Sequence, residues 1–140
     1  IGCYYLQTQS LALWLVLPAT AYGLLAVAVL NINNLRDLDN DLENGKLTFA
    51  ALIGFNQARI YQGLLLGLAL ASFALSFIYL TPSLGYLAFA FSLFIVWLHL
   101  KKLIKINKPS QAAALLPCIL FSVTATSLTY CCLVLAAKFI

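Results

Sequence analysis

The acidic residues of this 140-residue chain are its clearest candidates for chemistry, because all four lie within seven consecutive positions. They are Asp37, Asp39, Asp41 and Glu43. If this stretch is helical, at about 100° per residue, Asn33, Asp37 and Asp41 share one face and Asp39 points nearly the opposite way. Two carboxylates stacked on one face repel each other unless a cation lies between them.

The ligand types on this face indicate which cation it would bind. Oxygen ligands without histidine or thiolate suit a hard cation, for which Mg²⁺ is the natural choice, and Mg²⁺ usually shares its coordination sphere with phosphate oxygens. Arg36, Lys46 and Arg59 are close in the sequence and suited to bind phosphate charge. The alternative is a solvated acidic loop that binds nothing. We favour the cation site because every acid of the chain is in this stretch. The expected metal ligands are Asn33, Asp37 and Asp41.

The composition of the rest of the chain places this stretch beside a membrane. Hydrophobic residues make up 64% of the chain and charged residues 9%, against about 45–50% and about 25% in a soluble domain. So little polar surface requires that the chain be embedded mostly in membrane lipid, and an all-α integral membrane fold is expected. The sequence has no nucleotide fingerprint or nucleic-acid patch, so we expect no nucleic-acid partner.

Uncharged runs divide the chain into four expected transmembrane helices. Residues 11–30 form a 20-residue apolar run, which at 1.5 Å per residue spans about 30 Å, the thickness of a hydrocarbon core. The uncharged run 60–98 is too long for one helix, and Pro82 supplies a break. Residues 1–140 are expected to form a single membrane domain, with spans at about 9–34, 57–80, 84–104 and 111–137 and a motif loop at 35–56.

The basic residues predict the orientation of these spans. With four spans, seven of the eight Lys and Arg residues lie on one side and only Lys138 on the other. The positive-inside rule then places the acidic stretch on the cytoplasmic side of a multi-pass protein of the cell inner (plasma) membrane. The seven residues are Arg36, Lys46, Arg59, Lys101, Lys102, Lys105 and Lys108.

The acidic stretch also resembles a motif of a known family. NNLRDLDNDLENGKLT, residues 33–48, resembles the second aspartate-rich motif of the UbiA family of intramembrane prenyltransferases. The resemblance is closest to the menaquinone-biosynthesis branch, which acts on 1,4-dihydroxy-2-naphthoate, and ARIY at 58–61 also looks like that branch. The positions that match the motif pattern of this branch are Asn33, Asn34, Arg36, Asp37, Asp41, Gly45, Lys46 and Thr48.

This resemblance implies a larger fold than four helices. Family members have nine transmembrane helices and two aspartate motifs, so this chain would supply helices six to nine and the second motif. The chain begins with Ile and contains no Met, and we therefore expect a C-terminal fragment whose partners include the remaining N-terminal helices of the same protein. Because half of the metal site would be missing, we expect residues 1–140 alone to be inactive.

The resemblance also implies the reaction. A polyprenyl diphosphate would ionise with the help of Mg²⁺, with Asp37 and Asp41 as the catalytic carboxylates that hold the metal and Asn33 as a further ligand. The prenyl group would pass to an aromatic acid acceptor, 1,4-dihydroxy-2-naphthoate, which loses its carboxylate as CO₂ to give demethylmenaquinone. The residues expected to contact the diphosphate are Asn33, Asn34, Arg36, Lys46 and Arg59.

Three other readings remain open at this stage. Another aromatic acceptor, such as 4-hydroxybenzoate, would need only a different acceptor pocket. A membrane cation transporter would also place acids at a membrane mouth, but it needs polar residues that continue through the bilayer. In the third reading this chain is a purely structural half of a larger protein, and the partner half carries the chemistry. His99, the single histidine, is expected to be an interfacial residue rather than a base.

Overall fold

The computed structural model describes residues 1–78 and 83–137, with side chains described for residues 1–76 and 90–132. Every regular element in these residues is a helix, as the composition predicts. The expected break at Pro82 and the basic residue Lys138 lie outside the described residues.

The first long helix starts after two short elements. Helix α1 (Gly2–Thr8) is followed by a 3-10 turn, η1 (Leu13–Leu15), and then by α2 (Val16–Arg36). Pro18 lies in the first turn of α2, where its missing N–H costs no intrahelical hydrogen bond. The segment expected as a span at 9–34 is thus a continuous α-helix from Val16 and ends two residues later than expected.

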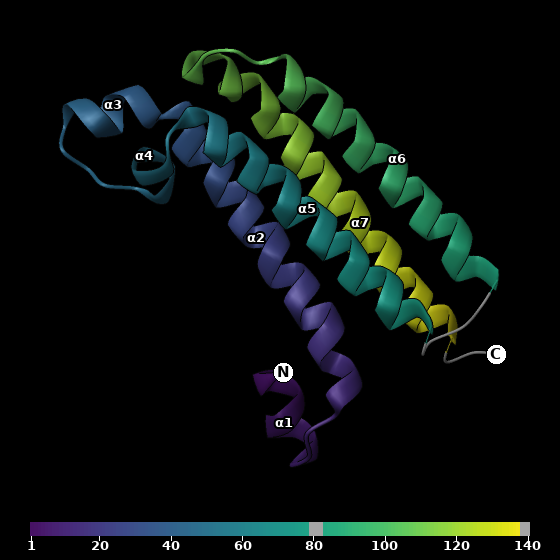
Figure 1. Ribbon diagram of the computed structural model, residues 1–140. Coiled ribbons are helices and arrows are strands. Elements are labelled where there is room, and N and C mark those ends of the chain that lie inside the picture. Colours follow the sequence, from purple (N-terminus) through teal and green to yellow (C-terminus); the bar gives the residue numbers. More distant parts are fainter. Residues whose placement is uncertain (79–82, 138–140) are drawn as a thin grey trace.

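The stretch expected as a loop at 35–56 contains two short helices. The chain turns at Asp37 and continues as α3 (Leu38–Glu43). Helix α4 (Phe49–Ile53) follows, and the hydroxyl of Thr48 accepts a hydrogen bond from its first turn. Both helices project from the end of α2, so the acidic residues sit on ordered backbone rather than on a free loop (Figure 1).

Three further long helices complete a bundle with α2. They are α5 (Phe55–Ile78), α6 (Ser83–Lys105) and α7 (Leu116–Ala137), and a 3-10 helix, η2 (Pro109–Leu115), precedes α7. Helix α2 packs mainly on α5, α6 packs on α7, and α7 with η2 packs back on α2. Helices α3 and α4 and the connection between α6 and α7 all lie at one end of the bundle (Figure 1).

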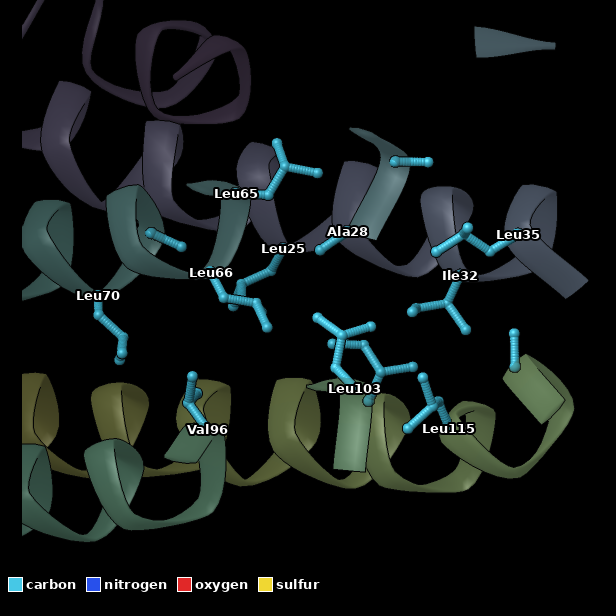
Figure 2. Close-up of a cluster of buried hydrophobic side chains, with 14 of the residues drawn as sticks. Leu25, Ala28, Ile32, Leu35, Leu65, Leu66, Leu70, Val96, Leu103 and Leu115 are labelled. Carbon is cyan, nitrogen blue, oxygen red and sulfur yellow. The ribbon is translucent and has the colours of Figure 1, made fainter. Parts of the chain in front are cut away.

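The core is built from aliphatic side chains on one face of each helix. Along α2 the buried residues recur at spacings of three and four, which is the period of a single helix face. Figure 2 shows this face meeting leucine and valine side chains of α5, α6 and η2. The buried apolar residues of α2 are Ala21, Leu25, Ala28, Ile32 and Leu35.

The outside of the bundle carries many large apolar side chains, which is typical of a membrane protein. Large side chains such as Leu64, Phe94 and Phe121 are more than half exposed. Among the described residues, three helical segments are long and apolar enough to cross a membrane: Leu13–Arg36, Phe55–Ser76 and Pro109–Cys132. Helix α6 has 23 residues, and its role as a fourth span remains a prediction.

Candidate functional site

The acidic stretch keeps its helical hydrogen bonds through the bend at Asp37. Asp37 has φ −91° and ψ 4°, which ends the regular geometry of α2. Even so, its N–H donates to the Asn33 carbonyl at 3.0 Å, and the Asp41 N–H donates to the Asp37 carbonyl at 2.8 Å. The i, i+4, i+8 relation of Asn33, Asp37 and Asp41 is therefore kept by consecutive backbone hydrogen bonds. Asn33 and Asp37 are half-buried and Asp41 is buried, whereas Asp39 and Glu43 are exposed.

A glycine turn brings a lysine back to the buried aspartate. After α3, Gly45 adopts φ +67°, a left-handed conformation that glycine reaches without steric cost. The Gly45 N–H donates to the Leu42 carbonyl at 3.2 Å and the Lys46 N–H donates to the Asp41 carbonyl at 2.8 Å, which is the Schellman pattern of a helix C-terminus. The same turn places Lys46 Nζ 3.1 Å from Asp41 Oδ1. The sequence indicated Gly45 and Lys46 as motif positions, and the structure explains why they are adjacent.

The other aspartate of the pair is bound by an arginine. Arg36 Nε and Nη2 donate to the two carboxylate oxygens of Asp37 at 2.7 and 2.6 Å. The Arg36 guanidinium lowers the pKa of the Asp37 carboxyl below its ordinary value, and the positive charge of Lys46 lowers it further. Asp37 is thus held ionised, as a metal ligand must be. The effect of Lys46 on Asp37 also places this lysine within electrostatic reach of both carboxylates.

Asp41 is the residue whose surroundings fit a bound cation best. Its side chain is 4% exposed, and within the described part of the chain its Oδ2 atom has no hydrogen-bond partner. A buried carboxylate oxygen without a partner is unfavourable unless positive charge approaches it. An oxygen ligand of this kind, with the carboxylate of Asp37 and the amide of Asn33 close in sequence, suits Mg²⁺.

The chain nevertheless supplies only part of a metal site. Among the described residues, no group of three or more His, Cys, Asp or Glu side chains is placed to hold a metal ion. Two carboxylates and an amide would leave about half of an octahedral Mg²⁺ shell to waters, phosphate oxygens or ligands from another segment. The side chains of Asn33 and Asn34 make no hydrogen bond in the described structure, so their polar atoms are available for such a ligand.

Arg59 lies in a different environment from the other expected diphosphate ligands. Its Nη2 donates to the Ile104 carbonyl near the C-terminus of α6 at 2.8 Å, and its guanidinium lies 5.6 Å from the centre of the Phe55 ring. The residue borders a cavity of about 410 Å³ between α5 and α6. In the structure Arg59 therefore caps α6, and a contact with diphosphate stays a prediction.

Buried polar residues deeper in the bundle were not anticipated from the sequence. Asn31 and Gln62 lie 3% and 0% exposed in the contact between α2 and α5. His99, which we expected at the membrane interface, is likewise 0% exposed inside the bundle. The signal that could have found all three is a polar side chain inside an apolar run, since such a residue in a membrane helix faces the protein interior.

The fold and the site together define a class of protein: a helical membrane protein with carboxylates and cationic side chains at one end of an apolar bundle. The sequence model of the UbiA prenyltransferase family matches residues 1–125. The chain belongs to the UbiA prenyltransferase family, and the resemblance seen in its motif is confirmed. The matched family is, by its description, a family of prenyltransferases.

Two curated relatives are similar in sequence to part of this chain. The chain is 45% identical over 96 residues to a 1,4-dihydroxy-2-naphthoate octaprenyltransferase of Haemophilus influenzae, a match that covers 69% of this chain and 27% of the relative. It is 53% identical over 75 residues to the protein of the same name from Escherichia coli K12, covering 54% of this chain and 24% of that relative. The matches thus span about a quarter of the length of these relatives. No solved structure gives a significant match to this chain.

Proposed function

We propose that this chain is part of an enzyme that transfers a polyprenyl group from polyprenyl diphosphate to 1,4-dihydroxy-2-naphthoate. The two curated relatives bear the name of this activity, and both matches exceed 40% identity. The observation that carries the proposal is Asp41 Oδ2, which is buried beside Lys46 without a partner among the described residues, four residues after an ionised Asp37. These carboxylates would hold Mg²⁺, and the ion would supply positive charge that stabilises a departing diphosphate.

In the proposed mechanism the protein's own residues hold the diphosphate and protect the cation. Asp37, Asp41 and Asn33 hold the metal, and Arg36 and Lys46 neutralise diphosphate oxygens with help from Asn34 and Arg59. The allylic C–O bond breaks and its electron pair leaves with the diphosphate. Charge that develops on those oxygens is stabilised by groups already in position. The apolar bundle excludes water, which would otherwise quench the allylic cation.

The second half of the proposed reaction takes place on the aromatic ring. A ring carbon of 1,4-dihydroxy-2-naphthoate forms the new C–C bond with the allylic cation, and the ring then loses its carboxyl group as CO₂. The products are diphosphate, CO₂ and demethylmenaquinol, the reduced form of demethylmenaquinone. No oxidant or reductant is needed for this step.

The proposed setting is a nine-helix bundle in the cell inner membrane. In this arrangement α2, α5, α6 and α7 are four of the nine spans, and the end that carries α3 and α4 faces the cytoplasm. The end of α6 and the segment after it carry Lys101, Lys102, Lys105 and Lys108, and they lie at the same end as the acidic residues (Figure 1). That distribution of basic residues supports the cytoplasmic orientation.

The direct test supplies the full-length protein in lipid with Mg²⁺, a polyprenyl diphosphate and either 1,4-dihydroxy-2-naphthoate or 4-hydroxybenzoate. We expect prenylated product with the naphthoate and loss of turnover when EDTA removes the metal. Asp37→Ala and Asp41→Ala should each lower kcat by about 100-fold or more, because each removes a charge that stabilises the leaving group. Asp39→Ala is the matched control, since Asp39 is exposed in the same helical stretch. Normal turnover by either of the first two variants would contradict the assigned roles, and product only from 4-hydroxybenzoate would replace the acceptor.

A further inference from the structure

Two buried amides join α2 to α5 below the acidic stretch. Asn31 Nδ2 donates to the Ala58 carbonyl at 3.0 Å and to Gln62 Oε1 at 2.9 Å. The carbonyl of Ala58 can only accept a hydrogen bond, so the atom of the Asn31 amide that faces it must be the donor Nδ2. Because Nδ2 also faces the Gln62 side chain, the Gln62 atom at this contact must be the acceptor Oε1. Asn31 Oδ1 and Gln62 Nε2 are therefore directed away from this contact.

These two outward atoms are buried and have no partner among the described residues. One of them, Asn31 Oδ1, is an acceptor and the other, Gln62 Nε2, is a donor. Leaving such atoms unpaired in an apolar interior is unfavourable, so native structures usually satisfy them with protein groups or ordered water. A group that both donates and accepts a hydrogen bond would complete the pair.

His99 is a group of this kind on the neighbouring helix. Both of its ring nitrogens are buried without a partner in the described part of the chain. Full burial favours the neutral imidazole, which offers one donor and one acceptor. The unmet donor and acceptor of His99 are thus complementary in kind to the unmet acceptor and donor of the Asn31–Gln62 pair.

The register of α5 against α6 places His99 close to the level of Gln62. Arg59 reaches the Ile104 carbonyl, and a Cβ added at Gly63 would lie 4.0 Å from the Leu100 side chain. The two helices are therefore antiparallel with Gly63 opposite Leu100. Because the helices run in opposite directions, Gln62 and His99 each lie one residue to either side of this contact, so their levels differ by about 3 Å along the axis. Both are fully buried. Gln62 Nε2 and the ring nitrogens of His99 make no hydrogen bond to each other, and an ordered water can bridge two such polar groups.

We infer that Asn31, Gln62 and His99 form one hydrogen-bonded layer across α2, α5 and α6, closed by an ordered water, and that this layer positions the acidic stretch. Helix association in lipid lacks a hydrophobic driving force, so a buried polar contact helps side-chain packing to fix the register of one helix on another. Asn31 precedes Asp37 by six residues, which is about 9 Å along a helix. The inferred role of Asn31, Gln62 and His99 is to position the residues of the acidic stretch. This role rests on the proposed function, prenyl transfer.

The first test asks whether the layer exists, and it needs no activity. In the full-length protein, Gln62→Leu, His99→Leu and the double variant are compared by thermal unfolding in detergent. Each single variant should lower the midpoint, because it leaves buried partners unpaired. The double variant should lower it by less than the sum of the two shifts, because the residues share one network. Additive shifts would overturn the layer.

The second test asks whether the layer positions the metal ligands. His99→Leu should raise the Mg²⁺ concentration for half-maximal prenyl transfer by about tenfold, the effect of losing an outer residue that orients a metal site. His99→Gln keeps one donor and one acceptor and should restore the value. Val96→Ala is the control, because it removes buried volume from the same helix without removing a polar group. A shift in His99→Leu no larger than that in Val96→Ala would overturn the positioning role. If the protein without substitutions formed no prenylated product, the proposed function would be wrong. The unfolding test would still show whether the layer exists.

Discussion

At the scale of single residues, the site is defined by which cation each aspartate faces. Asp37 is half-buried and held by Arg36 through both carboxylate oxygens. Asp41 is buried, yet among the described residues only its Oδ1 has a partner, the exposed amine of Lys46. The two carboxylates are four residues apart but differ in solvation, so they are not equivalent ligands. Asp41 has the oxygen that most needs an additional positive charge.

Lys46 is the residue whose substitution should separate substrate binding from chemistry. We expect Lys46→Met to raise KM for the polyprenyl diphosphate about 10- to 100-fold, the loss of one charge-assisted hydrogen bond. Lys46→Arg should recover most of the affinity because it keeps the charge. Steady-state kinetics of the full-length protein with varied diphosphate substrate measures this effect.

Lys105→Met provides the control for Lys46, since Lys105 is an exposed lysine at the same end of the bundle. Its loss removes the same charge without removing a neighbour of the aspartates. If both variants raise KM equally, Lys46 acts only through the general positive potential of this surface.

At the scale of elements, the end of α3 connects backbone geometry to the site. The left-handed residue Gly45 reverses the chain, so that the N–H and the amine of Lys46 both reach Asp41. The same element bends at Asp37 without losing the hydrogen bonds to Asn33 and from Asp41. Helix α3, with the bend at Asp37 before it and the turn at Gly45 after it, therefore positions Asp37, Asp41 and Lys46 together.

Gly45→Ala tests this connection. An L-residue at φ +67° costs about 1–2 kcal/mol, so the turn should open and Lys46 should lose its contact with Asp41. We expect kcat/KM for the diphosphate substrate to fall about tenfold, since about 1.4 kcal/mol corresponds to a factor of ten.

The comparison for Gly45→Ala is Gly45→Asn, because asparagine tolerates the left-handed region better than other residues with a side chain. It should retain more activity than the alanine variant. Equal losses in both would show that the conformation of residue 45 does not control the site.

At the scale of the whole molecule, the described helices form one apolar bundle with its charged groups gathered at one end (Figure 1). The exposed faces of α2, α5, α6 and α7 carry large apolar side chains that suit either lipid or further helices. The matched relatives are about four times as long as the aligned segment. The partial metal site and this difference in length lead to the same expectation about activity.

We predict that purified residues 1–140 in lipid, with Mg²⁺ and both substrates, form no prenylated product. The reason is that this chain supplies two carboxylates and one amide where an Mg²⁺–diphosphate complex needs a fuller set of ligands. Product formation is measured by extraction and chromatography, with the full-length protein as the positive control. Turnover by residues 1–140 alone would show that the second half of the site is dispensable.

The sequence alone was sufficient to determine the helical class, the membrane setting and the family. Apolar runs of membrane length and the clustering of every acid are local properties, and the spacing from Asn33 to Thr48 is local as well. For the same reason the spacing of Asn33, Asp37 and Asp41 along a helical backbone could be predicted, because it depends only on hydrogen bonds four residues apart.

Only the tertiary structure decided which polar groups are buried and what they face. The carbonyl that Arg59 binds lies 45 residues away along the chain, and Gln62 lies 31 residues from Asn31. His99 looked interfacial because lysines follow it in the sequence, but the packing of α6 turns it into the bundle. Such contacts depend on how helices pack in three dimensions, and the spacing of residues within one helix does not contain that information.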